Sequence, residues 1–189
     1  MIEGVGLFLV SVLIIILTVI LISFILIFNS FISLKNNIDK SWANIDVLLK
    51  QRSNEIPNLV STVKGYLKHE KDTLESLTKA RSFLLESKTL SQKAAADNII
   101  SDLVKTVFAV AESYPDLKAV ENFLKLQNRI TGLENELSDR REFYNDSVTI
   151  YNTRIQSIPD LIVAKLMHLN RIDLFKASLD DQKYVKVNL

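Results

Sequence analysis

Residues 5–28 read VGLFLVSVLIIILTVILISFILIF, and this stretch decides the architecture of the chain. Only Gly6, Ser11, Thr18 and Ser23 within it are not hydrophobic. A bilayer core about 30 Å thick is crossed by about 20 such residues in a helix. The sequence therefore predicts a transmembrane helix over residues 5–28, with residues 1–4 as a short extracytoplasmic N-terminus.

Two other interpretations of this run are less favoured. A buried core helix is disfavoured because core helices rarely continue this long without a charge. A cleaved signal peptide needs a positive n-region, a shorter apolar core and small residues at a cleavage site. No Lys or Arg precedes the run and no Ala-x-Ala comes after it, so a retained anchor is the favoured interpretation.

The charges of the chain are separated from this run. Glu3 is the only charged residue before Lys35, so all 23 Lys and Arg and 21 of the 22 Asp and Glu come after residue 34. A balance of 23 − 21 = +2 there gives no basic footprint for nucleic acid. Lys35 and Lys40 lie close behind the run, and the positive-inside rule then places the N-terminus outside and the large C-terminal part in the cytoplasm.

Beyond the anchor, apolar residues recur every three or four positions, which indicates helices. The first stripe includes Arg52 at one turn and Pro57 within its length, and it continues to about Glu86. Because proline removes a hydrogen bond and clashes with the carbonyl four residues back, a kink or short break is expected near Ser53–Pro57. The apolar members of the stripe are Ile38, Trp42, Ile45, Leu49, Ile56, Leu59, Val63 and Leu67.

A turn is expected at residues 86–91, and the next helix at about 91–112. Thr89 and Gln92 have the spacing of a capping box at its start. Tyr114-Pro115-Asp116 should end this helix, with Asp116 as the cap of the next helical segment. The predicted core face of the helix comprises Ala95, Ile99, Leu103, Val107 and Val110.

The longest regular pattern covers residues 120–155. It gives about five heptads of a coiled-coil-like seam, with Arg140 at the one polar step. Ser157-Ile-Pro159-Asp160 should end it and start a shorter helix to about Leu169. Residues 171–189 show no period and are interpreted as a frayed tail. The fold class is therefore all-α: one transmembrane helix continuing into an antiparallel bundle of long helices over residues 29–170.

No constellation of residues in the sequence indicates catalysis. His69-Glu70 begins a zinc-protease pattern, but Thr73 stands where its second His is required. The chain has two His, no Cys, no Gly-rich phosphate loop and no Gly-x-Ser-x-Gly elbow. We therefore predict no catalytic, cofactor-binding or metal site, and a protein that is not an enzyme.

One polar feature accompanies the long seam. Glu134, Arg141, Asn145 and Asn152 lie seven, four and seven residues apart. They form either a solvated helix face, an interhelical hydrogen-bond network that fixes register, or a ligand site. Possible partners on the first bundle helix are Asn44, Asp46, Gln51 and Arg52. Trp42, the only Trp, is expected in the bundle core rather than at the membrane interface.

Several segments of the chain resemble the LemA family. The similar residues cover roughly 28–160. They are Ser41–Arg52, Ile56–Val60, Val63–Tyr66, His69-Glu70 and Ala80-Arg81; then Glu112–Ala119, Glu121–Phe123 and Leu126-Gln127; then Glu134, Arg141, Tyr144-Asn145, Val148, Tyr151-Asn152 and Pro159. Phe28-Asn29 departs from the family's Tyr-Asn, Val120 from its Asn, and the Gly and aromatic residues expected after Pro159 are weak around Met167–Phe175.

The resemblance implies a bacterial single-pass protein of the inner membrane with a cytoplasmic helical bundle. No enzymatic activity is established for the family, whose members often occur beside membrane metalloprotease genes, with relatives that help to build magnetosome membranes. The leading hypothesis is a non-catalytic, membrane-anchored scaffold or adaptor that binds a membrane protein, such as a metalloprotease, or a second copy of itself. The alternative is an envelope stress or signal sensor that transmits through the kinked helix joining anchor to bundle.

Overall fold

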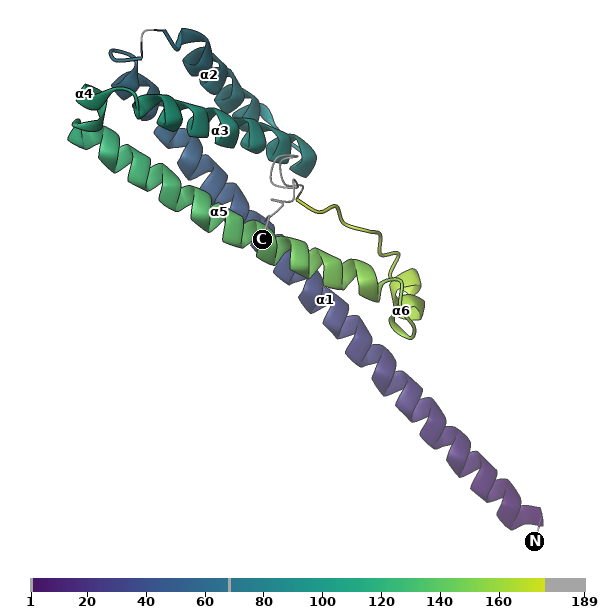
Figure 1. Ribbon diagram of the computed structural model, residues 1–189. Helices are drawn as coiled ribbons and strands as arrows, with labels where there is room; N and C mark the ends of the chain where they lie inside the picture. Colours follow the sequence, from purple (N-terminus) through teal and green to yellow (C-terminus); the bar gives the residue numbers. More distant parts are fainter. Residues whose placement is uncertain (1, 68, 176–189) are drawn as a thin grey trace, which may run out of the picture. The chain divides into compact units, whose positions relative to one another are not determined.

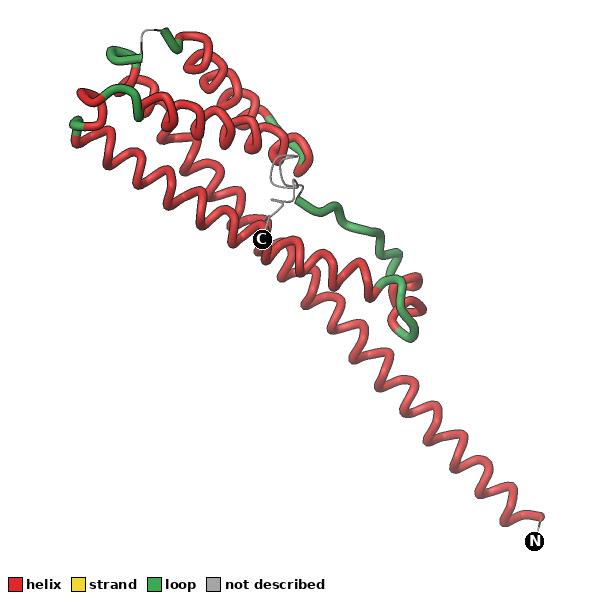
Figure 2. The backbone as a smooth tube through the Cα atoms, in the orientation of Figure 1, coloured by secondary structure: helices red, strands yellow, loops and turns green. Residues whose placement is uncertain are grey.

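The computed structural model describes residues 2–67 and 69–175, and this part of the chain is helical with no strand (Figures 1 and 2). The predicted all-α class is confirmed. The helices are α1 (Ile2–Val63), α2 (Lys71–Glu86), α3 (Leu90–Ala111), α4 (Pro115–Lys118), α5 (Glu121–Arg154) and α6 (Asp160–Leu166).

Helix α1 continues from the apolar N-terminal run into the bundle without interruption. It is 62 residues long and contains Pro57, so a break near Ser53–Pro57 is wrong and a kink stays a prediction. Its most apolar stretch is entirely unburied by the rest of the protein, as expected for a helix that faces lipid. The helix is thus compatible with a single-pass membrane anchor.

The predicted stripe on α1 is the buried one, but it does not continue as helix to Glu86. Helix α1 ends at Val63, and a turn that contains Gly65 precedes α2 at Lys71. The apolar pattern extends across the turn because Leu67, within the turn region, is again buried, at 1% exposed. The Leu67 amide bonds to the Val63 carbonyl at 2.9 Å. A residue that returns to the core side after a turn preserves the apolar spacing of a single helix.

The start of α3 is confirmed, whereas its predicted core face is only partly right: Val107 is buried, and Leu103 and Val110 are half-buried. The Thr89 and Gln92 side chains form the predicted capping box. Ala95 and Ile99, however, are exposed, while Ile100 and Val104 are buried. The true face also contains polar residues, so apolar spacing alone assigns the core to the neighbouring strip. Buried residues of α3 are Ala94, Ala96, Asp97, Ile100, Ser101, Val104, Val107 and Ala111.

The remaining helices agree closely with the sequence. Tyr114, rather than Asp116, is the N-cap of α4, with Pro115 as its first residue. The seam of α5 is buried at most of its positions between Phe123 and Ile155, with Leu126 half-buried. The polar residue on the seam is Arg141 rather than the predicted Arg140, which is 48% exposed.

Helix α6 ends in a Schellman motif. The amide of Leu169 bonds to the Ala164 carbonyl at 3.0 Å and that of His168 to the Lys165 carbonyl at 3.1 Å. His168 occupies the left-handed position of this motif, with φ 52°.

The chain divides into two compact units, described separately here. The first joins α1 up to Lys40 with residues 146–172, and the second joins residues 41–145 with the chain from Asp173. Within the second unit, α1 and α5 run antiparallel, since Trp42 meets Tyr144 and Glu55 meets Arg129. Within the first unit, the Ser30 hydroxyl of α1 accepts a hydrogen bond from Arg154 of α5, which fits the same antiparallel direction.

Of the predicted tail, residues 171–175 are described and residues 176–189 lie outside the described residues. Phe175 is 2% exposed, and its ring centroid is 6.3 Å from that of Trp42. Trp42 is half-buried there, beside Tyr144. Residues 171–175 are therefore ordered parts of the fold, and the prediction that they fray is wrong.

Candidate functional site

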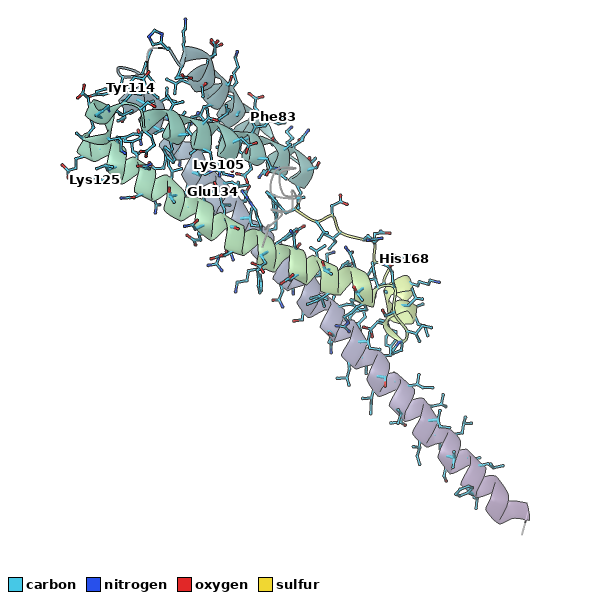
Figure 3. The ribbon with its side chains drawn as sticks, in the orientation of Figure 1. Phe83, Lys105, Tyr114, Lys125, Glu134 and His168 are labelled. Atoms are coloured by element: carbon cyan, nitrogen blue, oxygen red, sulfur yellow. The ribbon has the colours of Figure 1, made fainter. Side chains whose placement is uncertain are left out.

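The centre of the second unit holds a buried cluster of charges from three helices, the charge network. Helix α1 supplies Arg52, α3 supplies Asp97, and α5 supplies Glu134 and Arg141; Glu134 is labelled on α5 in Figure 3. Two positive and two negative groups leave the network without net charge. Glu134 and Arg141 share a face of α5, because seven residues make two helical turns.

Arg52 bonds to both of the other helices. Its Nη2 donates to a carboxylate oxygen of Asp97 and, at 3.0 Å, to the Asp97 carbonyl. Its Nη1 donates to Glu134 and, at 3.0 Å, to the Ser101 hydroxyl. A guanidinium has a planar fork of five N–H donors, which suits it to joining several acceptors at once.

Asp97 is bonded from two sides. Its second carboxylate oxygen accepts from Nη2 of Arg141, and its side chain is fully buried. Burial raises the pKa of the Asp97 carboxyl, and the guanidinium groups of Arg52 and Arg141 oppose this rise, while Glu134 adds to it. The ionised form of this carboxyl in a dry interior therefore depends on both arginines.

Ser101 closes the network one turn beyond Asp97. Its hydroxyl, which accepts from Arg52, donates to Glu134 at 3.0 Å. Among the described side chains, the buried Nε atoms of Arg52 and Arg141 and the Ser53 hydroxyl have no hydrogen-bond partner. The donors and acceptors of the network otherwise satisfy one another.

Pro57 is matched by a partner on α2. Proline has no amide hydrogen, so the carbonyl of Ser53, four residues earlier, loses its intrahelical partner. The Nε of Arg81 donates to this carbonyl at 2.9 Å. Helix α1 can thus stay helical across Pro57 because a side chain of α2 satisfies the released carbonyl.

Asn145 and Asn152 do not belong to the charge network. Each amide side chain pairs with the backbone of one residue in the C-terminal segment, donating through Nδ2 and accepting through Oδ1. Asn145 bonds to Phe175 at 3.0 and 2.8 Å. Asn152 bonds to Ile172 at 2.8 and 3.0 Å. Each side-chain amide therefore forms the pair of hydrogen bonds that the backbone of a neighbouring strand would otherwise form with the C-terminal segment.

The Tyr before each Asn adds a third bond to the same segment. The Tyr144 hydroxyl donates to the Asp173 carbonyl at 3.1 Å, and the Tyr151 hydroxyl to the Asn170 carbonyl at 3.0 Å. Burial raises the pKa of Tyr151, which keeps its phenol in the protonated, donating form. The two Tyr-Asn pairs act as clamps, one in each unit.

The structure thus brings together three of the five residues predicted for an interhelical network: Arg52, Glu134 and Arg141. Sequence reasoning missed Asp97 and Ser101, because the wrong face of α3 placed them on the outside. Asp46 bonds instead to Lys93 of α3. Asn44 is exposed and Gln51 is half-buried. The signal in the sequence that could have indicated these two residues is their four-residue spacing, which places them one helical turn apart on the same face of α3.

The described residues include no group of three or more His, Asp or Glu placed to hold a metal ion. One apolar groove lies between the end of α1 and α2, lined by Val60, Leu67, Leu74 and Thr78 among others. The arrangement of side chains is therefore one that can join helices to one another.

Comparison with known proteins connects this chain to one family. The model of the LemA family matches residues 41–189. "Protein LemA" of Metamycoplasma hominis is 27% identical over 149 residues, 76% of this chain and 66% of its own length. Magnetosome proteins MamQ 1 and MamQ 2 of Paramagnetospirillum magneticum are each 26% identical over 81 residues, 43% of this chain and 30% of their own length. The chain thus spans less than two thirds of these curated relatives.

Proposed function

The chain belongs to the LemA family, and from that premise and the geometry of the charge network we propose that it is a non-catalytic, membrane-anchored helical scaffold or adaptor. The observation that supports the proposal is the mutual pairing of Arg52, Asp97, Glu134 and Arg141. Groups that act on a substrate are aimed into a cavity with perturbed pKa values and room for a ligand. Here the charged groups are bonded to each other across three helices.

The charge network suits a scaffold because it specifies alignment. Burying ions costs free energy, and apolar residues of equal volume are often as stabilising. A network of directional bonds instead selects one register among several that an apolar seam would accept. The proposed benefit is a bundle with a fixed surface, which a partner can recognise.

The proposed partner is a membrane protein, with a membrane metalloprotease as one candidate, or a second copy of the chain. Helix α1 supports this choice, since an anchor confines the bundle to the surface of a bilayer and raises its effective concentration for other membrane proteins. The proposed orientation, from Lys35 and Lys40, is N-terminus outside and bundle in the cytoplasm of a bacterial cell. Two relatives carry the name magnetosome protein, which is compatible with an accessory role.

Purification of the full chain from its own membranes tests this function. We expect one protein in fixed stoichiometry, or a defined oligomer, to accompany the chain. A matched variant replaces residues 5–28 with an unrelated transmembrane sequence of the same length. If the bundle binds the partner, this variant retains it. A monomer with no stoichiometric companion from either preparation would contradict the proposal.

A second proposed function is signal transmission, and the continuity of α1 favours it. One helix joins the apolar run to the Arg52 and Pro57 region without a break. A displacement of the anchor could therefore reach the Arg81 bond to the Ser53 carbonyl. Cross-linking across Ser53–Pro57 in stressed and resting cells separates the two functions, since a scaffold should show the same yield in both states.

A further inference from the structure

Helix α6 presents an apolar face that the protein leaves uncovered. Ile158 lies in the turn just before the helix, and Ile162 and Leu166 are four residues apart and share one side of it. They are 81%, 60% and 65% exposed. Val163 and Ala164 on the other side are buried. Three large exposed aliphatic side chains so close together exceed the single exposed residues that are ordinary on a protein surface.

This apolar face is tied to the end of the anchor by direct contacts within the first unit. Arg154 donates to the Ser30 hydroxyl at 2.5 Å and lies 5.0 Å above the Phe31 ring. The same guanidinium bonds at 2.5 Å through Nε to Asp160, the first residue of α6. One arginine therefore connects α6 to the turn of α1 just past residue 28, and Figure 1 shows α6 next to the C-terminal end of α5.

The depth of this connection is set by helix geometry. A helix rises about 1.5 Å per residue, so Ser30 lies about 3 Å beyond Phe28 along α1. The headgroup layer on each side of the hydrocarbon core is about 5–7 Å thick. Ser30, Phe31 and the Arg154 guanidinium are thus at the depth of the lipid headgroups when residues 5–28 span the membrane.

We propose that Ile162 and Leu166 of α6, with Ile158 from the turn before it, insert into the bilayer surface beside the anchor. The occupant of this face is lipid, because α6 is held through Arg154 to the end of the anchor at headgroup depth. Lys165 and Arg171 are exposed near it and suit anionic headgroups, as in helices that lie in the interface. The inference rests on the anchor assigned to residues 5–28 and not on which side of the membrane the bundle occupies.

The absence of Cys from the chain makes the test direct. Single-cysteine variants of the full chain are labelled with an environment-sensitive fluorophore and placed in nanodiscs of neutral and anionic phospholipid, one copy per disc. Ile162→Cys reports on α6, Ile14→Cys on the anchor, and Lys125→Cys on an exposed position of α5. A lipid with a nitroxide on its acyl chain and aqueous iodide are the two quenchers.

The expected result is lipid quenching at position 162 at least about threefold stronger than at 125, as for a buried interfacial side chain. Adding Ile158→Gln and Leu166→Gln to the Ile162→Cys variant should reduce it towards the value at 125. All three side chains are exposed, so the fold should persist, and circular dichroism checks this.

Three other outcomes would overturn the inference. Quenching at 14 but not at 162 leaves the anchor in place and removes α6 from the membrane. No lipid quenching at 14 removes the anchor itself. Protection of 162 from both quenchers, or only when several copies share a disc, indicates a protein contact instead of lipid.

Discussion

Arg140 and Arg141 are adjacent in sequence and opposite in role. Arg141 bonds to Asp97 and is 15% exposed, whereas Arg140 is 48% exposed and has only an i,i+4 pair with Glu136 at 3.8 Å. Removing one partner of a buried ion pair leaves the other charge uncompensated, which costs about 3–5 kcal/mol. An exposed pair contributes about 0.3–0.5 kcal/mol.

Arg141→Ala should therefore lower the free energy of unfolding by about 3 kcal/mol, while Arg140→Ala should change it by less than about 0.5 kcal/mol. Urea titration of the full chain in mild detergent, monitored by the fluorescence of Trp42, measures both. Equal stability of the two variants would remove the network from the account of the fold.

His168 adopts a backbone conformation that costs more free energy for histidine than it would for glycine. Its φ of 52° lies in the left-handed region, which costs an L-residue about 1–2 kcal/mol, and glycine is the usual residue at this position of a Schellman motif. His168→Gly should raise stability by about 0.5–1 kcal/mol after the extra chain entropy of glycine is subtracted. His168→Ala is the matched control, and a glycine variant no more stable than alanine would contradict the assignment.

At the scale of the element, Pro57 and Arg81 form a unit that a double-mutant cycle can isolate. Arg81→Ala leaves the Ser53 carbonyl without a partner, at a cost of about 1–3 kcal/mol for a buried polar group. In a Pro57→Ala background the new amide can bond to that carbonyl, so the same change should cost less. Additive effects of the two substitutions in urea titration would show that the Arg81 bond does not compensate for the proline.

The Tyr-Asn clamps are a second element-level device. Asn145→Leu approximately keeps the side-chain size and removes both bonds to Phe175, worth about 1 kcal/mol each. Hydrogen exchange at the Phe175 amide should then be faster by about one to two orders of magnitude. Exchange at Ile172, bonded to Asn152, serves as the internal control, and an unchanged rate at Phe175 would contradict the clamp.

The elements show what the sequence could and could not predict. The capping box at Thr89 and the seam of α5 rest on local spacing, and both are confirmed. The turn around Gly65 was missed because Leu67 returns to the core in phase. The face of α3 was only partly right because its core side also contains Asp97 and Ser101, whose burial is stabilised by Arg52 from a distant part of the chain. A pattern of apolar residues cannot predict polar residues whose partners are made only by tertiary contact.

For the molecule as a whole, the sequence divides into an uncharged run and a nearly neutral bundle, and the structure joins them in one helix. The buried charges of the network hold the bundle helices to one another, and the proposed scaffold function places recognition of a partner on the outer surface of the bundle. A scaffold, as proposed for this chain, acts only through what it binds, so its test is assembly rather than chemistry.

The most direct measurement is the mass of the particle that contains the full chain after extraction from its native membrane into lipid nanodiscs. We expect a discrete mass above that of one chain in its disc, which corresponds either to further copies or to one stoichiometric membrane protein. Arg140→Ala should leave this mass unchanged. A single chain in every particle, at native abundance and with the bundle folded, would contradict the account.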